Sequence, residues 1–264
     1  MRFINNSLKY DYDVAYLRSY GSDTYKLSVM RCVRKSGYEI KNFKKKCSVN
    51  DSKLEENIIR ARSKLFEYAY CNDFEYFLTI TLDSKKYNRQ DLNKFNKDLS
   101  QFIRNYNKKY NLNIKRIFVP EKHRDGCSWH MHGFIMGLPL SHLRLFSLDE
   151  KLPKYIREKL LKGQNVYEWV AYREKFGFND FEHIRNKEAC SKYITKYITK
   201  ELANSVTTLN AHLFYASKGL STSKLIKKGS LRFGLSNPHY ENDYCKGFWL
   251  KSSDEKSLTH YFVD

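Results

Sequence analysis

The sequence contains no long apolar segment. No window approaches about 18 consecutive apolar residues, the length that a helix needs to cross a bilayer. Residues 1–6 also lack the apolar stretch of a signal peptide. We therefore expect a soluble, cytoplasmic protein with no membrane partner.

Closely spaced cysteines and phosphate-binding loops are absent too. The six cysteines are scattered without a Cys-x-x-Cys pair, which argues against a zinc ribbon and a disulfide framework, so we interpret them as reduced and mostly structural. No Gly-x-x-x-x-Gly-Lys-Ser/Thr segment occurs either. The chain is therefore expected to contain no P-loop helicase domain.

Acidic residues are few beside the basic ones. The sequence has 48 Lys and Arg against 29 Asp and Glu, a net charge of +19, with one basic cluster at residues 41–46. This excess is typical of polyanion binders, although it does not distinguish DNA from RNA or from an anionic membrane. The 21 Tyr and 17 Phe add possible base-stacking surfaces, most of which we expect in the core.

Apolar residues make up 41% of the 264 residues, which is typical of a globular protein. Their spacing predicts strands at 24–30, 76–83, 114–121, 130–136 and 166–171, and helices at about 50–70 and 90–108. The Asp125-Gly126 pair predicts a turn that joins the third and fourth of these strands as an antiparallel hairpin. Residues 138–163 are expected to form a helical or loop insertion, and we find no catalytic grouping across 138–186.

Two histidines, His130 and His132, are separated by a single apolar residue in one of these strands. Residues two apart in a strand point to the same face, so both imidazoles are expected to face one way. Neutral imidazole is the commonest protein metal ligand, and such a pair forms half of a divalent-ion site. The alternative is a polar strand face with two solvated histidines.

The predicted hairpin places Glu121 across from the histidine pair. A carboxylate beside two imidazoles gives three ligands with open positions for water or substrate oxygens, which suits Mg²⁺ or Mn²⁺ better than closed structural zinc. His123 lies on the same face of the predicted strand as Glu121, and it is the alternative third ligand.

Residues 193–200 repeat Tyr-Ile-Thr-Lys twice in tandem. Residues four apart share a face on a helix and on a strand, so Tyr193 and Tyr197 are expected side by side, next to a row formed by Lys196 and Lys200. A tyrosine hydroxyl attacks a phosphodiester once the phenol, with a pKa of about 10, is helped to lose its proton. A metal ion and nearby lysines would supply that help. The alternative is two packing residues.

These features occur in the order of three motifs: the strand at 77–82, Glu121 with His130-Met131-His132, and Tyr193-x-x-x-Tyr197. In this the chain resembles the HUH endonucleases, and more narrowly it is similar to the two-tyrosine rolling-circle replication initiators of small single-stranded DNA phages and plasmids. The resemblance covers roughly residues 75–200. It implies an α+β fold with a central antiparallel sheet of about five strands and flanking helices, an RNA-recognition-like palm, in a single endonuclease domain spanning 1–264.

The resemblance also implies roles for these residues. His130 and His132 would bind Mg²⁺ or Mn²⁺ with Glu121, and Tyr193 and Tyr197 would be nucleophiles. One tyrosine would nick single-stranded DNA at an origin hairpin and hold the 5′ phosphate, while the free 3′ hydroxyl primes synthesis. The second would cut the regenerated site, and the strand would be rejoined as a circle. The host helicase and DNA polymerase would be partners, in the cytoplasm of a bacterial cell.

Other classes remain open from sequence. A two-tyrosine transposase of the same superfamily carries the same residues, and a non-catalytic DNA-binding repressor would use the same fold. A zinc-stabilised structural or RNA-binding protein requires a cysteine pair that this sequence lacks. The order in which the two tyrosines act is open as well, because each has a lysine three residues later.

Overall fold

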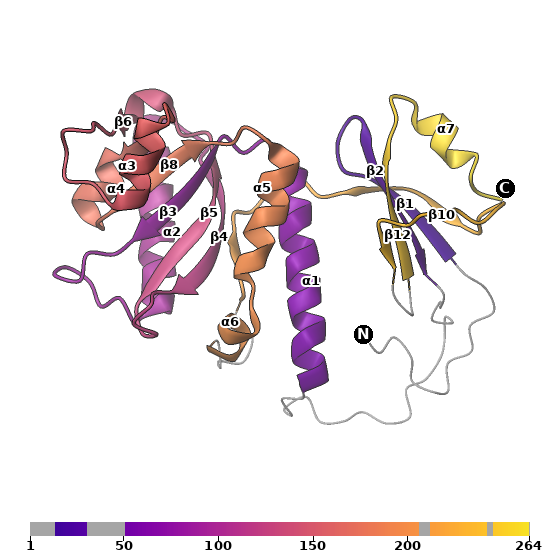
Figure 1. Ribbon diagram of the computed structural model, residues 1–264, viewed down its shortest axis with the longest axis horizontal. Coiled ribbons are helices and arrows are strands. Elements are labelled where there is room, and N and C mark those ends of the chain that lie inside the picture. Colours follow the sequence, from indigo (N-terminus) through magenta and orange to yellow (C-terminus); the bar gives the residue numbers. More distant parts are fainter. Residues whose placement is uncertain (1–13, 31–50, 206–211, 242–244, 264) are drawn as a thin grey trace. The chain divides into compact units, whose positions relative to one another are not determined.

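The computed structural model describes residues 14–30, 51–205, 212–241 and 245–263 (Figure 1). The basic cluster at 41–46 lies outside the described residues. The chain divides into two compact units: Asn57–Leu220 forms one, and Met1–Glu56 with Ser221–Asp264 forms the other. That the two act as a single endonuclease domain stays a prediction.

The unit formed by Asn57–Leu220 is built on an antiparallel sheet of seven strands, in the order β6-β7-β8-β3-β5-β4-β9. Its strands are β3 (Tyr76–Thr81), β4 (Lys115–Lys122), β5 (Trp129–Met136), β6 (Leu143–Leu145), β7 (Tyr167–Trp169), β8 (Asn179–His183) and β9 (Tyr215–Ala216). The sheet therefore has seven strands where about five were expected; β6 and β7 are three residues long and β9 is two. The predicted α+β class with a central antiparallel sheet is confirmed.

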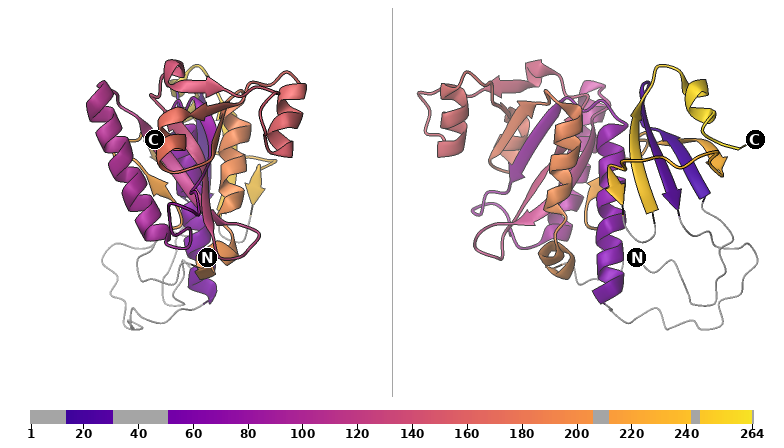
Figure 2. Two further views of the ribbon diagram at one scale, coloured as in Figure 1. Left: turned by 90° about the vertical axis from the view of Figure 1, so that its left-hand side faces the viewer. Right: turned by 45° about the vertical axis from the view of Figure 1, so that its right-hand side comes forward.

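Helices cover both faces of this sheet, with α2 on one face and α5 on the other (Figure 1, Figure 2). The helices are α1 (Asp51–Tyr70), α2 (Leu92–Tyr110), α3 (Lys154–Leu161), α4 (Val170–Lys175), α5 (Lys187–Ile194) and α6 (Lys200–Ser205), with short 3₁₀ turns η1 (Leu140–His142) and η2 (Thr195–Tyr197). The main core lies between α2 and the sheet, where Leu99 and Phe102 meet Ile80 and Met131. The face toward α5 carries His132 and Thr79, together with Phe77, whose ring packs against Tyr193 of α5.

Local sequence explains where α2 begins and ends. The Asp91 side chain accepts a hydrogen bond from the backbone N–H of Lys94, which satisfies one of the free donors of the first turn. Asn111 adopts the left-handed conformation, with φ of 51°, that commonly terminates a helix. The predicted helix is confirmed, displaced by two residues at each end.

One predicted strand is wrong in its second half. Strand character was expected over 166–171, but β7 ends at Trp169 and α4 begins at Val170. The reason is the spacing of Tyr172 and Phe176, which lie four residues apart and are both fully buried. That spacing places both side chains on one face of a helix. Their burial stabilises the helix despite the β propensity of the preceding residues.

The second unit has its own five-stranded antiparallel sheet, in the order β10-β1-β2-β12-β11. Its elements are β1 (Val14–Ser19), β2 (Thr24–Met30), β10 (Lys224–Gly229), β11 (Tyr240–Glu241), β12 (Cys245–Lys251) and helix α7 (Glu255–Thr259). The predicted strand at 24–30 is confirmed as β2. Leu17, Leu27 and Phe248 form the core of this unit with Leu258 of α7.

The structure also bears on the expected state of the cysteines and on the expected lack of a membrane span. The cysteines within the described residues, at positions 71, 127, 190 and 245, are free thiols, while Cys32 and Cys47 lie outside that part of the chain. No described helix is both long and apolar enough to cross a bilayer.

Candidate metal centre and tyrosine pair

The β4–β5 hairpin positions the candidate ligands. Glu121 lies directly opposite His130 in the register of the two antiparallel strands, so the predicted hairpin is confirmed. At its turn, Gly126 has a φ of 69°, and the Asp125 carboxylate accepts hydrogen bonds from the backbone N–H groups of Cys127 and Ser128. These bonds lower the pKa of Asp125 to about 2 and keep it as the anion that holds the turn.

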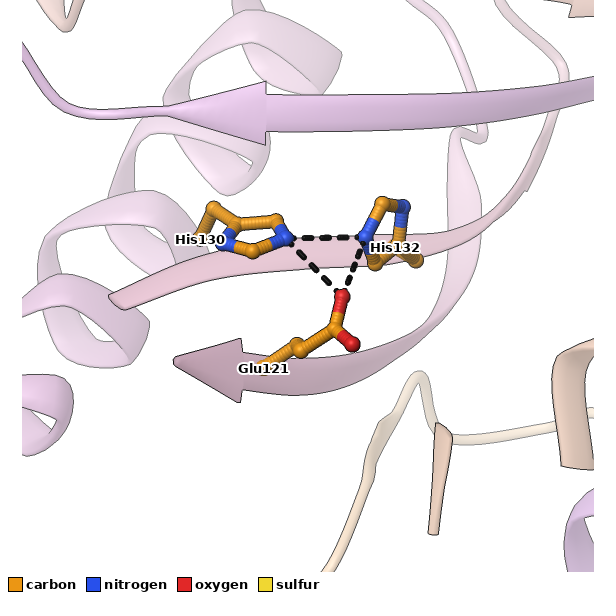
Figure 3. A group of neighbouring side chains, drawn as sticks. All are labelled: Glu121, His130 and His132. Carbon is orange, nitrogen blue, oxygen red and sulfur yellow. Dashed lines mark hydrogen bonds and ion pairs between the residues drawn. The ribbon is translucent and has the colours of Figure 1, made fainter. Parts of the chain in front are cut away.

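Three ligand atoms converge at the end of this hairpin (Figure 3). Oε2 of Glu121 lies 3.0 Å from Nε2 of His130 and 2.8 Å from Nε2 of His132, and the two nitrogens are 2.9 Å apart. Glu121 comes from β4 and both histidines from β5. The three residues form a group that could hold a metal ion.

The three ligand atoms lie close enough to contact a single ion. They are 2.8 to 3.0 Å from one another. A centre with three protein ligands leaves further coordination positions for water or substrate oxygens.

The protonation states of the group are those that a cation requires. Hydrogen bonds with His130 and His132 lower the pKa of Glu121 to about 2, so its carboxylate is ionised at neutral pH. Burial lowers the pKa of His132, which favours the neutral imidazole. The side chains of His130 and His132 are only 13% and 12% exposed, whereas that of Glu121 is 41% exposed. The carboxylate therefore forms the open edge of the centre.

His123, the alternative third ligand, lies nearby but outside this group. Its ring centroid is 4.2 Å from that of His130, and its buried Nε2 has no hydrogen-bond partner among the described residues. Burial lowers the pKa of His123 to about 4, so this ring is neutral at neutral pH. The geometry brings Glu121 rather than His123 to the two Nε2 atoms.

A cavity of about 560 Å³ opens beside the centre. Its lining consists of Arg89, Glu121, Lys122, His123, Arg124, Asp125 and His130. Three of these residues are cationic, and the Asp125 carboxylate is already engaged by the turn. Sequence reasoning did not single out Arg89, because it lies in the loop between β3 and α2 and belongs to no motif.

The tyrosine pair lies against the same centre. The Tyr197 ring stacks on the imidazole of His132, with centroids 4.2 Å apart and planes 17° apart. The Tyr197 hydroxyl donates a hydrogen bond to the Tyr193 hydroxyl across 3.0 Å. The expected proximity of the two phenols is confirmed, although the α-helix ends at Ile194 and Tyr197 lies in the 3₁₀ turn that follows.

The two phenols differ electrostatically. Burial alone would raise the pKa of Tyr193, but hydrogen bonds from Lys196 and Tyr197 outweigh it, and the net pKa is lowered. The Lys196 ammonium lies 3.3 Å from the centroid of the Tyr193 ring. Burial and the interaction with Tyr193 raise the pKa of Tyr197. Lys200 begins α6, and its side chain is not among those that the structure describes.

Two polar residues of the sheet were missed by the sequence analysis. The Thr79 hydroxyl lies 3.2 Å from Nδ1 of His132, and Asp180, on the next strand, is only 2% exposed. Asp180 falls in the region 138–186, where no catalytic grouping was found. The available signal was its position in a strand-like segment before Phe181, since an acidic residue is rarely buried without a partner.

The fold and the site together define a class: an α+β protein whose antiparallel sheet carries a candidate His₂Glu metal centre beside a pair of tyrosines. Residues 75–202 match the model of a family of replication-associated proteins, described as the ORF2 type. The matched segment runs from just before β3 into α6 and contains the entire candidate site. No curated protein and no solved structure matches the chain.

Proposed function

We propose that this protein initiates rolling-circle DNA replication by nicking single-stranded origin DNA with a tyrosine nucleophile. The observation that carries the proposal is the stack of Tyr197 on His132, with the Tyr193 hydroxyl hydrogen-bonded to that of Tyr197. This stack places two candidate nucleophiles at one candidate metal centre. The match to a replication-associated family supports the same interpretation.

The residues divide the chemistry between them. Glu121, His130 and His132 would hold Mg²⁺ or Mn²⁺, which supplies polarisation of the scissile phosphate and stabilisation of its developing charge. The tyrosine oxygen forms a bond to phosphorus as the bond from phosphorus to the 3′ oxygen breaks. The proton that the phenol loses is balanced by the one that the released 3′ oxygen takes up. The products are a 5′ phosphotyrosine and a free 3′ hydroxyl.

Tyr193 is the first nucleophile in this proposal. Its pKa is lowered and Lys196 lies beside its ring, so its phenolate forms more readily than that of Tyr197. Tyr197 then acts on the regenerated site, after the first phenolate has been consumed by the covalent bond. The hydrogen bond between the hydroxyls gives a path by which the state of one affects the other.

The basic cavity supports the assignment of single-stranded DNA as the substrate. Arg89, Lys122 and Arg124 surround a space that adjoins Glu121 and His130, so backbone phosphates next to the nick would meet cations there. The net charge of +19 adds long-range attraction for any polyanion. In this proposal a host helicase unwinds the duplex and a host DNA polymerase extends the free 3′ hydroxyl.

The first prediction concerns the covalent intermediate. Wild-type protein mixed with single-stranded origin DNA and Mn²⁺ is expected to form a protein–DNA adduct that survives denaturing electrophoresis. The double variant Tyr193→Phe, Tyr197→Phe is expected to form none, because both nucleophilic oxygens are gone. Tyr110→Phe, which alters an exposed tyrosine at the end of α2, is the matched control and should retain the adduct.

The single variants test the order of the two tyrosines. Tyr193→Phe should lose the first nick, whereas Tyr197→Phe should still nick once and fail to close the circle. The reverse pattern contradicts the assignment of Tyr193. An adduct from the double variant contradicts the proposed chemistry, and a double variant that keeps its biological function favours a repressor. Activity on transposon ends but not on a replication origin would favour the transposase.

A further inference from the structure

Three polar residues form one row across the sheet. Thr79 of β3 is paired with His132 of β5 on one side and with Asp180 of β8 on the other. Residues that are directly opposite in antiparallel strands point to the same face, so these side chains are neighbours. The row runs from His132, in the candidate metal centre, to Asp180, which is buried.

One hydrogen bond of this row reaches the candidate metal centre. The Thr79 hydroxyl lies 3.2 Å from Nδ1 of His132, the ring nitrogen that does not face Glu121. Asp180, the next residue in the row, is held by the Tyr155 hydroxyl, which donates to its Oδ2 across 2.8 Å.

The direction of this bond follows from the metal-bound state. Nε2 of His132 faces Glu121 and Nε2 of His130, so a metal ion held by the three residues would take the lone pair of this nitrogen. The single proton of the neutral imidazole would then be on Nδ1, and the Thr79 hydroxyl would accept it in a hydrogen bond.

We propose that Thr79 is a positioning residue that holds the His132 ring in the orientation required for metal binding through Nε2. The inference rests on the proposed function of Glu121, His130 and His132 as a metal centre. It applies to one histidine only, because the buried Nδ1 of His130 has no hydrogen-bond partner among the described residues.

The strand offers a matched control. Thr81 lies two residues after Thr79 and is paired with His130, yet it makes no hydrogen bond to Nδ1 of that ring. Thr79→Val and Thr81→Val therefore make the same change on the same strand, but only the first removes a bond to a candidate ligand. Thr79→Ser keeps the hydroxyl and serves as the rescue.

The experiment measures Mn²⁺ binding to the full chain by titration with electron paramagnetic resonance of the free ion. Removing such a supporting bond is expected to weaken binding by about 10- to 100-fold for Thr79→Val. Thr79→Ser and Thr81→Val should stay close to wild type.

The outcomes separate the inference from the proposal beneath it. Thr79→Val that binds Mn²⁺ as tightly as Thr81→Val overturns the positioning role while the metal centre stands. A wild-type chain that binds no Mn²⁺, or His132→Ala that binds it as tightly as wild type, overturns the metal centre and the positioning role together.

Discussion

Two carboxyl groups on the same face of the sheet have opposite pKa shifts. Hydrogen bonds with the two histidines lower the pKa of Glu121 to about 2, whereas burial raises the pKa of Asp180 to about 6. Glu121 is at the solvent edge, and its charge is stabilised by donors. Asp180 is fully enclosed, and its hydrogen bonds with Tyr155 and Thr79 only partly offset the loss of water.

The shift of Asp180 makes stability depend on pH. Its folded pKa lies above the unfolded value of 3.8, so the folded state holds the proton more tightly. The resulting stabilisation is complete below pH 3.8 and is lost as the pH rises through about 6. Relative to Asp180→Asn, the wild-type free energy of unfolding should fall by about 2 kcal/mol between about pH 4 and pH 7.

Urea unfolding at several pH values measures this difference. Asp149→Asn, at an exposed position of the same unit, is the control and should follow the wild-type pH profile. Parallel profiles for wild type and Asp180→Asn would show that the Asp180 carboxyl group does not titrate differently in the folded state.

At the scale of elements, the β4–β5 hairpin depends on one glycine beside the candidate ligands. Gly133 directly follows His132, and a Cβ atom there would lie 2.1 Å from the Ile117 carbonyl oxygen and 2.2 Å from Cδ1 of Phe118. The backbone oxygen cannot move aside without shifting β4. The close approach of the two strands therefore requires a residue without a side chain at this position.

Gly133→Ala is expected to push β4 away from β5. Overpacking of this kind typically costs about 1 to 3 kcal/mol of stability, so a lower Tm should appear in thermal unfolding followed by circular dichroism. Mn²⁺ binding should weaken as well, because Glu121 and the histidines lie on the two separated strands. Gly247→Ala in β12 is the control, since its nearest contact would be an ordinary 3.7 Å. Equal losses of stability in both variants would contradict the clash.

At the scale of the whole molecule, the net charge and the cavity contribute to DNA binding in different ways. The net charge of +19 attracts any polyanion, but only the cations around the cavity adjoin the candidate metal centre. Each phosphate contact on single-stranded DNA contributes about 0.7 to the slope of log affinity against log salt. Arg89→Ala with Arg124→Ala should thus reduce the slope by about 1.4, measured by fluorescence anisotropy over about 50 to 200 mM salt.

The control for this prediction removes the same charge elsewhere. Lys108→Ala with Lys109→Ala alters two exposed lysines at the end of α2, which covers the opposite face of the sheet. If both double variants change the slope equally, DNA binding depends on overall charge and the cavity has no special part in it.

Local patterns in the sequence were sufficient for much of the architecture. The apolar stripe of α2, the Asp125-Gly126 turn and the alternation that turns His130 and His132 to one face all depend on residues a few positions apart. These predictions hold because backbone geometry alone relates such neighbours. The same reasoning wrongly predicted a strand at residues 170–171, where the burial of Tyr172 and Phe176 stabilises a helix.

The sequence by itself thus determined the strand that carries the histidines, its pairing with Glu121 and the proximity of the two phenols. Only the tertiary structure decided that Tyr197 stacks on His132, that Arg89 faces the cavity beside the centre, and that the Thr79 hydroxyl meets Nδ1 of His132. The physical reason is separation along the chain. Contacts between residues dozens of positions apart depend on how strands are ordered in the sheet, and no local period encodes that order.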